Sequence, residues 1–581
     1  MDRREFLKTA GVLAAASTLA GCQTDSSTAP MAGNPFPTTV QSGSGGAKPS
    51  VTIPTTEQTK PVVNDLATLI NNRLTFGVRP SEPLFSSTAG STDDKILEDF
   101  LDRQLNPGSI DDSVFEERLQ RAGFETLQKS FKDLAYEHIT HNPYKNNDDR
   151  HWQWYVKPFY ELIRATFLRA IYSRQQLQEL LVDFWHNHFN VYGDQDDVSP
   201  LMVSYDRDVI REHVFGNFRQ FLEAVATHPS MLTYLNNRTN SDAGPNENFA
   251  RELLELHTMG AENYLGIQDP TSIEKDEHGF VRGYIDNDVY EAARCFTGWR
   301  MNDDLWEGEE EVDDSLTFLY YQPWHDRYNK FILGLYIPAD QSPQKDGRDV
   351  LDLLASHPGT ATHIARKLCR RFVSDDPPQG LVERVARTFM QEKDSPEQLR
   401  EVYKTLLLSQ EFRESSGGKL KRPLEWAVST MRALNVEMMQ LPEGVYWTTF
   451  MMGQPLFGHH QPDGYPDKAE HWINSMSSIY GWNLITGLVE NWWSDEEDGN
   501  NVRVDLLAQT PVEVSSATQL VDYWLERWQL QNLPAESRTA LIQFTAGEAG
   551  VDTPLNAEEL SEKIPALVTL ILISPQFRYR G

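Results

Sequence analysis

The sequence predicts a mainly α-helical protein, a large multi-helix body of two lobes with a small β-hairpin insertion near residues 315–336. From Leu66 onward, apolar residues recur at spacings of three and four, which is the period of an amphipathic helix. Turn signals such as Asn106-Pro107 separate these segments. A chain of 581 residues also exceeds what one ordinary core needs, and it therefore favours more than one lobe.

The first 22 residues predict an export signal that ends in a lipid-bearing cysteine. The run RREFLK at residues 3–8 resembles a twin-arginine signal, except that Asp2 stands where Ser or Thr is usual. The apolar run after it is too short to span a bilayer as a permanent helix. The run LAGC at residues 19–22 resembles a lipoprotein cleavage box, in which Cys22 becomes the lipidated first residue. We therefore expect a lipoprotein of the periplasm or outer membrane, and cleavage without a lipid is the alternative.

The remaining chain divides by composition and period into a tether and a body. Residues 23–62 are rich in Ser, Thr, Pro and Gly and have no apolar period, which indicates a flexible tether. Helical periods mark an N-terminal lobe at residues 63–300 and a C-terminal lobe at residues 349–581. Between the lobes, at residues 301–348, an acidic loop leads into SLTFLYYQPWHDRYNKFILGLYIP. Its two β-branched or aromatic runs around a polar turn predict the hairpin.

A weak internal repeat in the sequence favours a C-terminal lobe of two parts. Residues 397–413, EQLREVYKTLLLSQEFR, and residues 558–578, EELSEKIPALVTLILISPQFR, share a start and an end. The second run is four residues longer between its leucine and its serine. This repeat indicates a duplication.

Charge and cysteine content narrow the possible partners. The chain has 85 acidic and 53 basic residues and a net charge of −32, which argues against binding driven by phosphate neutralisation. We therefore expect no nucleic-acid partner, and membrane attachment only through the lipid at Cys22. Cys295 and Cys369 lie inside helical patterns, where buried free thiols are commoner than the alternative, one disulfide. The sequence has no Cys/His zinc spacing, Gly-x-Ser-x-Gly elbow, phosphate loop or dinucleotide fingerprint.

Residues 246–260, NENFARELLELHTMG, place many ionisable groups on one predicted helix. With a rotation of about 100° per residue, the apolar side chains between residues 249 and 256 fill one face, and His257 falls in the middle of it. A histidine among leucines must find a hydrogen-bond partner or lose stability. Gly260 predicts the end of the helix. A second face carries a predicted salt-bridge ladder at spacings of four, formed by Glu247, Arg251 and Glu255.

A second predicted helix, QLQELLVDFWHNHF, also buries a histidine. His188 lies on its apolar face, whereas His186 points the opposite way. Asp183 and His186 lie three residues apart on a shared face, which is the spacing that metal sites of helical bundles use. A chance pair on a solvated face is the alternative.

The two buried histidines predict the candidate site. If their helices pack together, His188 and His257 meet in one core, joined by Glu252 or by His325 and Asp326 of the hairpin turn. Such a cluster would be a catalytic acid/base pair or a metal site, and two satisfied structural histidines are the alternative. The candidate catalytic residues are therefore His188, His257 and Glu252. The candidate ligands of a divalent metal ion are Asp183, His186, His325 and Asp326.

Two other segments carry clustered charge. The helical run IARKLCRRFV at residues 364–373 places four basic side chains on one side, for which we expect ion pairs with carboxylates of another helix. A sugar acid or phosphate bound by this stripe is the alternative. The Gly/Pro-rich loop at residues 453–471 is the kind of loop where sites often lie, but its spacing fits no metal template. Its ionisable residues are His459, His460, Asp463, Asp467 and His471.

Short runs through nearly the whole body, in order, resemble a known family. They are residues 72–77, 185–189, 246–260, 288–289, 297–299, 325–326, 330, 333–334, 357–358, 367–368, 371–373, 453–456 and 574–577. On these residues the chain resembles the bacterial domain of unknown function 1800 family, whose members are large exported proteins without established activity. The resemblance implies export, and it implies a co-encoded exported protein with a sulfatase-like fold as a partner. His459 and His460 depart from the pattern, because prolines or other neutral residues are expected there.

Three functions are compatible with these observations. The first is a metal- or histidine-dependent enzyme that acts on an envelope or extracellular polymer through His188 and His257. The second is a non-catalytic lipoprotein that assists secretion or assembly of surface material, in which the same histidines lock helices together. The third, a sugar-binding platform built from the 14 tryptophans, ranks last because most of them, Trp185 and Trp299 included, fall on core-facing arcs.

Overall fold

The computed structural model describes residues 66–580 except for residues 83–92, 145–147, 304–314, 495–501, 532 and 549. The predicted signal at residues 1–22, including Cys22, lies outside the described residues, and so does the predicted tether at residues 23–62. Tertiary contacts gather Pro61–Gly581 into one compact unit. Among the described helices, none has the length and apolar character needed to cross a membrane.

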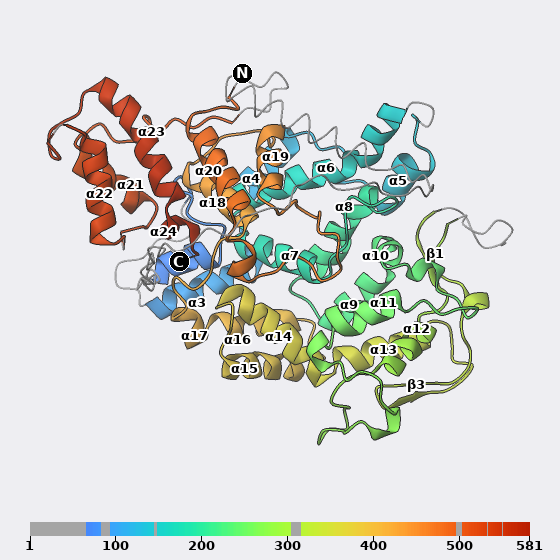
Figure 1. Ribbon diagram of the computed structural model, residues 1–581. Helices are drawn as coiled ribbons and strands as arrows, with labels where there is room; N and C mark the ends of the chain where they lie inside the picture. Colours follow the sequence, from blue (N-terminus) through green and yellow to red (C-terminus); the bar gives the residue numbers. More distant parts are fainter. Residues whose placement is uncertain are drawn as a thin grey trace, which may run out of the picture. The chain divides into compact units, whose positions relative to one another are not determined.

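The described chain is mainly α-helical, as predicted (Figure 1). The helices of its first half are α2 (Leu66–Arg73), α3 (Asp93–Gln104), α4 (Ser113–Arg121), α5 (Phe131–Ala135), α6 (Asp148–Tyr172), α7 (Gln176–His188), α8 (Met202–Ser204), α9 (Phe218–Thr227), α10 (Pro229–Tyr234), α11 (Glu247–Glu252) and α12 (Asp286–Cys295). Those of its second half are α13 (Lys345–Ala355), α14 (Pro358–Phe372), α15 (Gln379–Gln391), α16 (Gln398–Leu407), α17 (Gln410–Arg413), α18 (Pro423–Ala433), α19 (Glu443–Met451), α20 (Ser475–Val489), α21 (Ala517–Arg527), α22 (Ala535–Ala546), α23 (Ala557–Ile573) and α24 (Pro575–Arg578).

Short helical turns of two other kinds lie between these helices: π-helical turns, which are wider than an α-helix, and 3-10 turns, which are tighter. The π-helical turns, in which the hydrogen bond spans one residue more than in an α-helix, are η2 (Tyr136–Thr140), η4 (Tyr205–Arg211) and η6 (Leu253–His257). The 3-10 turns are η1 (Pro107–Ser109), η3 (Ser199–Leu201), η5 (Asn237–Thr239), η7 (Ala261–Asn263), η8 (Pro270–Ser272), η9 (Gln322–Trp324) and η10 (Ala469–His471).

The predicted β insertion exists, but its strands pair differently from the prediction. The first run contributes β2 (Phe318–Tyr320), which pairs antiparallel with β1 (Trp299–Met301), a strand that precedes the acidic loop. The second run contributes β3 (Lys330–Ile332) and β4 (Leu335–Ile337), which form their own hairpin. A tight turn with positive φ at Leu333 and Gly334 splits the second run and closes this hairpin.

The two segments of the internal repeat have the same local structure. In the first copy α16 is followed by Ser409, whose side chain accepts a hydrogen bond from the backbone of Phe412 and so caps the short helix α17. In the second copy α23 is followed by Ser574, which caps α24 in the same way through Phe577. The shared serine is therefore an N-cap in both copies.

The hydrophobic core extends through the whole described body. The largest fully buried side chains include Trp185, Trp299, Trp426 and Trp524, so these tryptophans offer no surface to a sugar. Cys295 and Cys369 are buried free thiols, as the commoner of the two alternatives predicted.

A buried ionic centre, built around Glu425 of α18, joins segments that are far apart in the sequence. The carboxylate of Glu425 lies 2.6 Å from the guanidinium of Arg371 on α14 and 2.9 Å from that of Arg580. It also accepts a hydrogen bond of 2.9 Å from the backbone N–H of Arg422. Asp183 of α7 completes the centre, because it pairs with both Arg371 and Arg422. Burial alone would raise the pKa of Glu425, but Arg371, Arg580 and Arg422 hold it well below its ordinary value.

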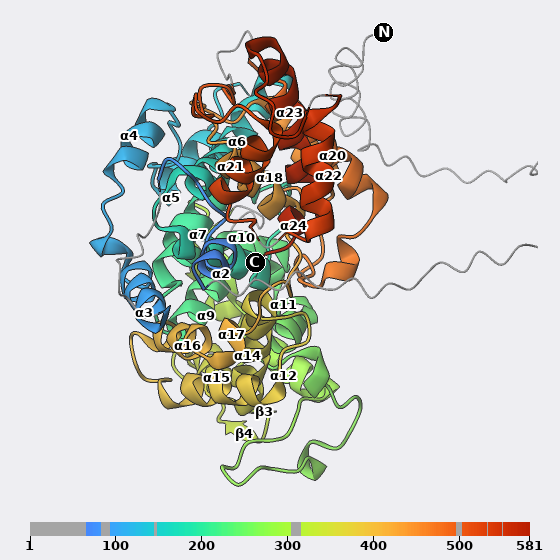
Figure 2. The same cartoon turned by 90° about the vertical axis from the view of Figure 1, so that its left-hand side faces the viewer.

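Arg73 connects α2 to this centre. Its guanidinium is fully buried and donates hydrogen bonds to the backbone carbonyls of Arg580, Phe372, Val373 and Ser415 at 2.7–3.0 Å. Arg580 in turn donates to the carbonyl of Arg73 at 2.8 Å. The first described helix and the end of the described chain therefore lie side by side, as both ribbon views show (Figures 1 and 2).

We expect the variant Glu425→Gln to lower the free energy of unfolding by about 3–5 kcal/mol, because it leaves buried guanidinium groups without their carboxylate. The matched control is Glu411→Gln, whose carboxylate pairs with the part-exposed Arg384 and should cost no more than about 1 kcal/mol. Urea denaturation followed by circular dichroism measures both. Equal losses in the two variants would show that the ionic centre does not stabilise the fold.

Candidate functional site

The structure brings the two predicted histidines together at the ends of two helical segments. His188 is the last residue of α7 and His257 is the last residue of the π-helical turn η6. Nε2 of His188 lies 3.1 Å from the backbone carbonyl oxygen of His257, and the ring centroids are 6.3 Å apart. Both side chains are buried, with 1% and 0% of their surface exposed. Their predicted burial and proximity are therefore confirmed.

Three ring nitrogens of this pair have no hydrogen-bond partner within the described part of the chain. They are Nδ1 of His188 and both nitrogens of His257. A carbonyl oxygen can only accept, so Nε2 of His188 carries its proton and Nδ1 is a free acceptor. Polar atoms that are buried without a partner are rare and costly, and their presence is a reason to look for a ligand or a reacting group.

The surroundings of the two rings keep them neutral at pH 7. Phe184, Trp185 and Phe189 pack around them, with Phe189 in contact with both rings. Burial, assisted by the positive charge of Lys367, lowers the pKa of His257 to about 3 and places that of His188 well below its ordinary value. A neutral imidazole can donate and accept hydrogen bonds at once, which a charged one cannot.

Helix α14 contributes two further groups that the sequence did not single out as site residues. His363 lies with its ring centroid 6.2 Å from that of His188, and its nitrogens lie 3.2 Å from the Leu256 carbonyl and 3.3 Å from the Glu262 carboxylate. Lys367 follows one helical turn later, and burial lowers its pKa to about 8. The spacing of four residues, which places His363 and Lys367 on one face, was the available signal. We call His188, His257, His363 and Lys367 the histidine site.

Gly260 lets the chain pass close to this site. Its φ of +90° lies in the left-handed region, and a Cβ there would lie 2.5 Å from Nδ1 of His363. The backbone N–H of Gly260 donates to the carbonyl of Leu254, so this residue closes the helical segment as predicted. Only glycine fits between the π-helical turn and α14.

The predicted ladder on this helical segment forms only in part. Arg251 pairs with Glu247 at 3.1 Å, as predicted, and its second carboxylate partner is Asp286 at 3.8 Å. The π-helical turn η6 begins at Leu253 and changes the rotation of the residues after it.

Glu252 contributes a carboxyl group whose pKa lies near neutral pH. Burial, with the negative charges of Glu255 and Asp463, raises its pKa to about 7. Among the described contacts it makes no hydrogen bond or ion pair with His188 or His257. The predicted direct link from Glu252 to the histidines is therefore not seen, although Glu252 ends α11 directly before the turn η6 that carries His257.

The loop at residues 453–471 is fastened to the end of α7 by asparagine side chains of the WHNHFN run. Asn187 exchanges two hydrogen bonds of 2.6 Å with the backbone of Tyr465, and Asn190 donates to the carbonyls of His459 and Gln461. Gly464 makes this contact possible, because a Cβ there would lie 2.0 Å from the Asn187 carbonyl oxygen. The loop thereby brings Asp463 close enough to influence the pKa of both Glu252 and Lys367.

The predicted metal ligands have separate partners. Asp183 belongs to the ionic centre, and His186 lies 2.9 Å from the Asp206 carboxylate. His325 faces Asp346 at 3.3 Å, while Asp326 pairs with Arg294 at 2.7 Å. Across the described ranges, no three His, Cys, Asp or Glu side chains are grouped so that they could hold a metal ion. The residues present therefore do not fit the predicted divalent metal.

The basic stripe of α14 pairs with carboxylates at one position only. Arg371 joins the ionic centre, as expected. Arg366, Lys367 and Arg370 make no ion pair in the part of the chain that the structure describes, and Arg370 donates instead to the backbone carbonyl of Asp375. In a protein with a net charge of −32, three half-buried cations without carboxylate partners favour the alternative, an anionic ligand.

Comparison with known proteins gives one match. Residues 69–579 match the model of a family described as protein of unknown function, DUF1800. No curated protein and no solved structure gives a significant match.

The buried His257 predicts a loss of stability in acid. Below about pH 6.5 the unfolded chain protonates this ring, whereas the folded protein does not do so until about pH 3, so the unfolded state binds more protons and stability falls as the pH falls. We expect His257→Gln to reduce the slope of unfolding free energy against pH by up to about 1.4 kcal/mol per pH unit across this window. Urea denaturation at a series of pH values measures the slope.

The control is His278→Gln, because His278 is exposed and should leave the slope unchanged. If the two variants show the same slope as the wild type, the His257 ring is hydrated or protonated in the folded protein.

Proposed function

The chain belongs to the DUF1800 family, whose description assigns no activity, and we propose that it is an exported enzyme that cleaves a polymer of the cell envelope by acid/base catalysis. The observation that carries the proposal is the histidine site, where three buried ring nitrogens without partners lie beside Lys367, a lysine without an ion pair. The signal-like run at residues 1–22 supports export and attachment through Cys22.

The groups around this site have the properties that proton transfer needs. General acids and bases work best when their pKa lies near the working pH, and the pKa values of Glu252 and Lys367, about 7 and about 8, meet this condition. The neutral rings of His188 and His257 supply hydrogen bonds rather than charge, in the way that a neutral imidazole stabilises a developing oxyanion. Lys367 or Glu252 would move the proton, and the histidines would orient the reacting oxygen.

The charge of α14 indicates the class of substrate. Within the described ranges, Arg366, Lys367 and Arg370 are cations without carboxylate partners, and they lie on the helix that carries His363 of the site. A polymer with carboxylate or phosphate groups, such as an acidic polysaccharide, would neutralise them. We propose such an anionic polymer as the substrate.

The second candidate is a non-catalytic lipoprotein that assists secretion or assembly, with the co-encoded sulfatase-like protein as its partner. The contacts that favour it are the hydrogen bond from His188 to the His257 carbonyl and the asparagine contacts that fasten the loop at residues 453–471. In this role the histidines lock segments together and carry out no chemistry.

Replacement of Lys367 separates the two candidates. We expect Lys367→Met to reduce the release of soluble fragments from acidic envelope polysaccharide by about 10²–10⁴-fold, because general acid/base groups contribute rate factors of that size. The melting temperature should stay close to that of the wild type, because Lys367 makes no ion pair with a described residue. Fragment release and thermal unfolding are measured on the same purified mature protein.

The matched control is Lys404→Met on α16, whose amine pairs with Glu401 at the surface and which should retain full activity. Equal fragment release by wild type and Lys367→Met, or no release by the wild type from any envelope fraction, would contradict the enzyme and favour the assembly role.

The proposed location has its own test. We expect Cys22→Ser to move the protein from the membrane fraction to the soluble periplasm, because a transmembrane anchor is not part of the proposal and the lipid supplies the attachment. Replacement of Arg3 and Arg4 by lysine should retain the precursor in the cytoplasm. Fractionation followed by immunoblotting measures both, and a Cys22→Ser protein that stays in the membrane would refute lipid attachment at this residue.

A further inference from the structure

Two buried lysines, separated by one residue, have different surroundings. Lys419 is 1% exposed, and its amine donates hydrogen bonds to the Asp375 carboxylate at 2.6 Å and to the Asp467 carbonyl at 2.8 Å. Lys421 is 3% exposed, but its amine makes no hydrogen bond or ion pair with any described residue. The amine lies over the face of the Phe577 ring, 3.8 Å from the nitrogen to the ring centroid. Lys421 is therefore a buried amine without a polar partner.

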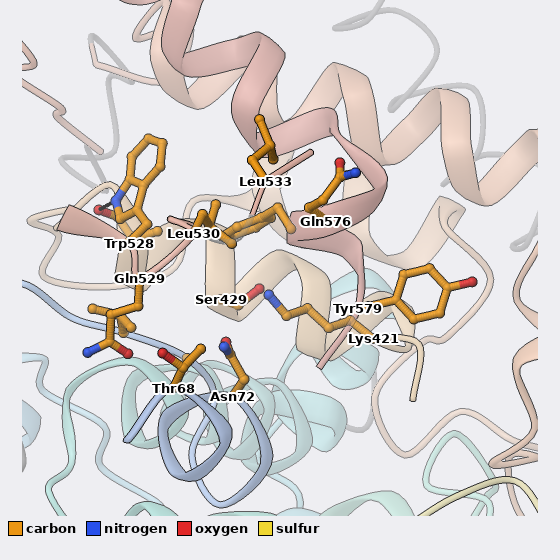
Figure 3. A pocket seen from close by; sticks show the side chains of 14 residues that line it. Thr68, Asn72, Lys421, Ser429, Trp528, Gln529, Leu530, Leu533, Gln576 and Tyr579 are labelled. Atoms are coloured by element: carbon orange, nitrogen blue, oxygen red, sulfur yellow. Dashed lines mark hydrogen bonds between the residues drawn. The ribbon is translucent and has the colours of Figure 1, made fainter. Parts of the chain in front are cut away.

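This amine faces a small pocket between α2, α18, α24 and the segment after α21 (Figure 3). Trp528, Leu530 and Leu533 give the pocket an apolar side, and the long side chain of Lys421 reaches into it from the side of Tyr579. The space open to water-sized molecules is about 30 Å³, which has room for about two or three groups of that size. None of the residues that line the pocket belongs to the histidine site.

The surroundings of Lys421 favour the uncharged amine. Burial lowers its pKa to about 7; the negative charge of Glu425 opposes this shift, and the positive charges of Arg580 and Arg578 add to it. About half of the Lys421 side chains therefore carry a free lone pair at pH 7, whereas an exposed lysine with a pKa near 10.4 has fewer than about one in a thousand. A lysine that is desolvated in an apolar pocket beside other cations is an activated nucleophile.

We propose that Lys421 is a reactive amine that forms an imine with a short-chain aldehyde bound in this pocket. The nitrogen lone pair attacks the carbonyl carbon, and the carbonyl oxygen takes up a proton to give the carbinolamine. The nitrogen gives up one hydrogen as the carbinolamine forms, and the hydroxyl group then leaves with the remaining amine hydrogen as water, so that a C=N bond replaces the C=O bond. The apolar side of the pocket holds the alkyl chain, and its volume restricts that chain to two or three carbons.

Polar groups at the wall of the pocket serve the proton steps. The hydroxyl of Ser429 donates to the Trp426 carbonyl at 3.1 Å, so its oxygen retains lone pairs for the leaving water. Gln576 and Tyr579 line the same pocket, but the Tyr579 hydroxyl points away from the Lys421 amine (Figure 3). This second activity is independent of the proposed polymer cleavage, because it uses none of the same residues.

Reductive trapping on the intact wild-type protein tests the proposal. The protein is incubated at pH 7 with acetaldehyde and cyanoborohydride, which reduces an imine to a stable secondary amine, and the modified lysines are located by peptide mass spectrometry. We expect Lys421 to react at least about tenfold faster than Lys404, with a half-maximal rate near pH 7.

Lys419 is the internal control, because it is equally buried but its amine is held by Asp375, and we expect it to remain unmodified. Benzaldehyde, which is too large for the pocket, should show no preference for Lys421. Lys421→Met should remove the fast reaction without changing the rate at Lys404. Equal rates at Lys421 and Lys404 in the folded wild type, or reaction of Lys421 only after unfolding, would overturn the proposal.

Discussion

The carboxylate of Glu425 is the point on which the rest of the fold depends. It neutralises guanidinium groups from α14, from the start of α18 and from the end of the described chain, while Arg73 binds the same region through backbone carbonyls. A charge buried at this depth is tolerated only when it is paired and hydrogen-bonded, so the segments that carry these residues must arrive in a single arrangement. The ionic centre specifies which helices are neighbours, and apolar packing, which is less selective, fills the space around them.

Helices α14 and α7 connect this ionic centre to the histidine site. On α14, Arg371 is held in the ionic centre, while Lys367 and His363 lie one and two turns earlier, respectively. On α7, Asp183 is held in the centre, and His188 lies five residues later. The two helices that supply the site are therefore fixed by buried charge at one end and meet His257 at the other. A rigid support of this kind preserves the position of the His257 ring, whose nitrogens have no hydrogen-bond partner in the described part of the chain.

The parts of the structure that follow from local pattern were predictable from the sequence. The helical period located α2, α7, α14 and the repeated pairs that end in α17 and α24, and the rotation of a helix placed His188 and His257 in the core. The pairing of β1 with β2 was not predictable, because it crosses the acidic loop and depends on tertiary contacts. For the same reason, the sequence could not show that Lys367 and Lys421 have no carboxylate partner among the described residues. A sequence shows that a lysine is present, but only the fold shows whether a carboxylate reaches it, as one does for Lys419.

The link between Arg73 and Arg580 spans 507 residues of sequence and has a consequence for the order of folding. Arg73 and Glu425 are synthesised long before Arg580, so until that residue emerges the ionic centre lacks one of its guanidinium groups and α2 lacks its final neighbour. Contacts between residues so distant in the sequence also form slowly, since the loop between them must first be ordered. The body therefore completes its folding after translation has passed Arg580. On the proposed twin-arginine route, which carries folded proteins, this late contact would therefore have to form before export.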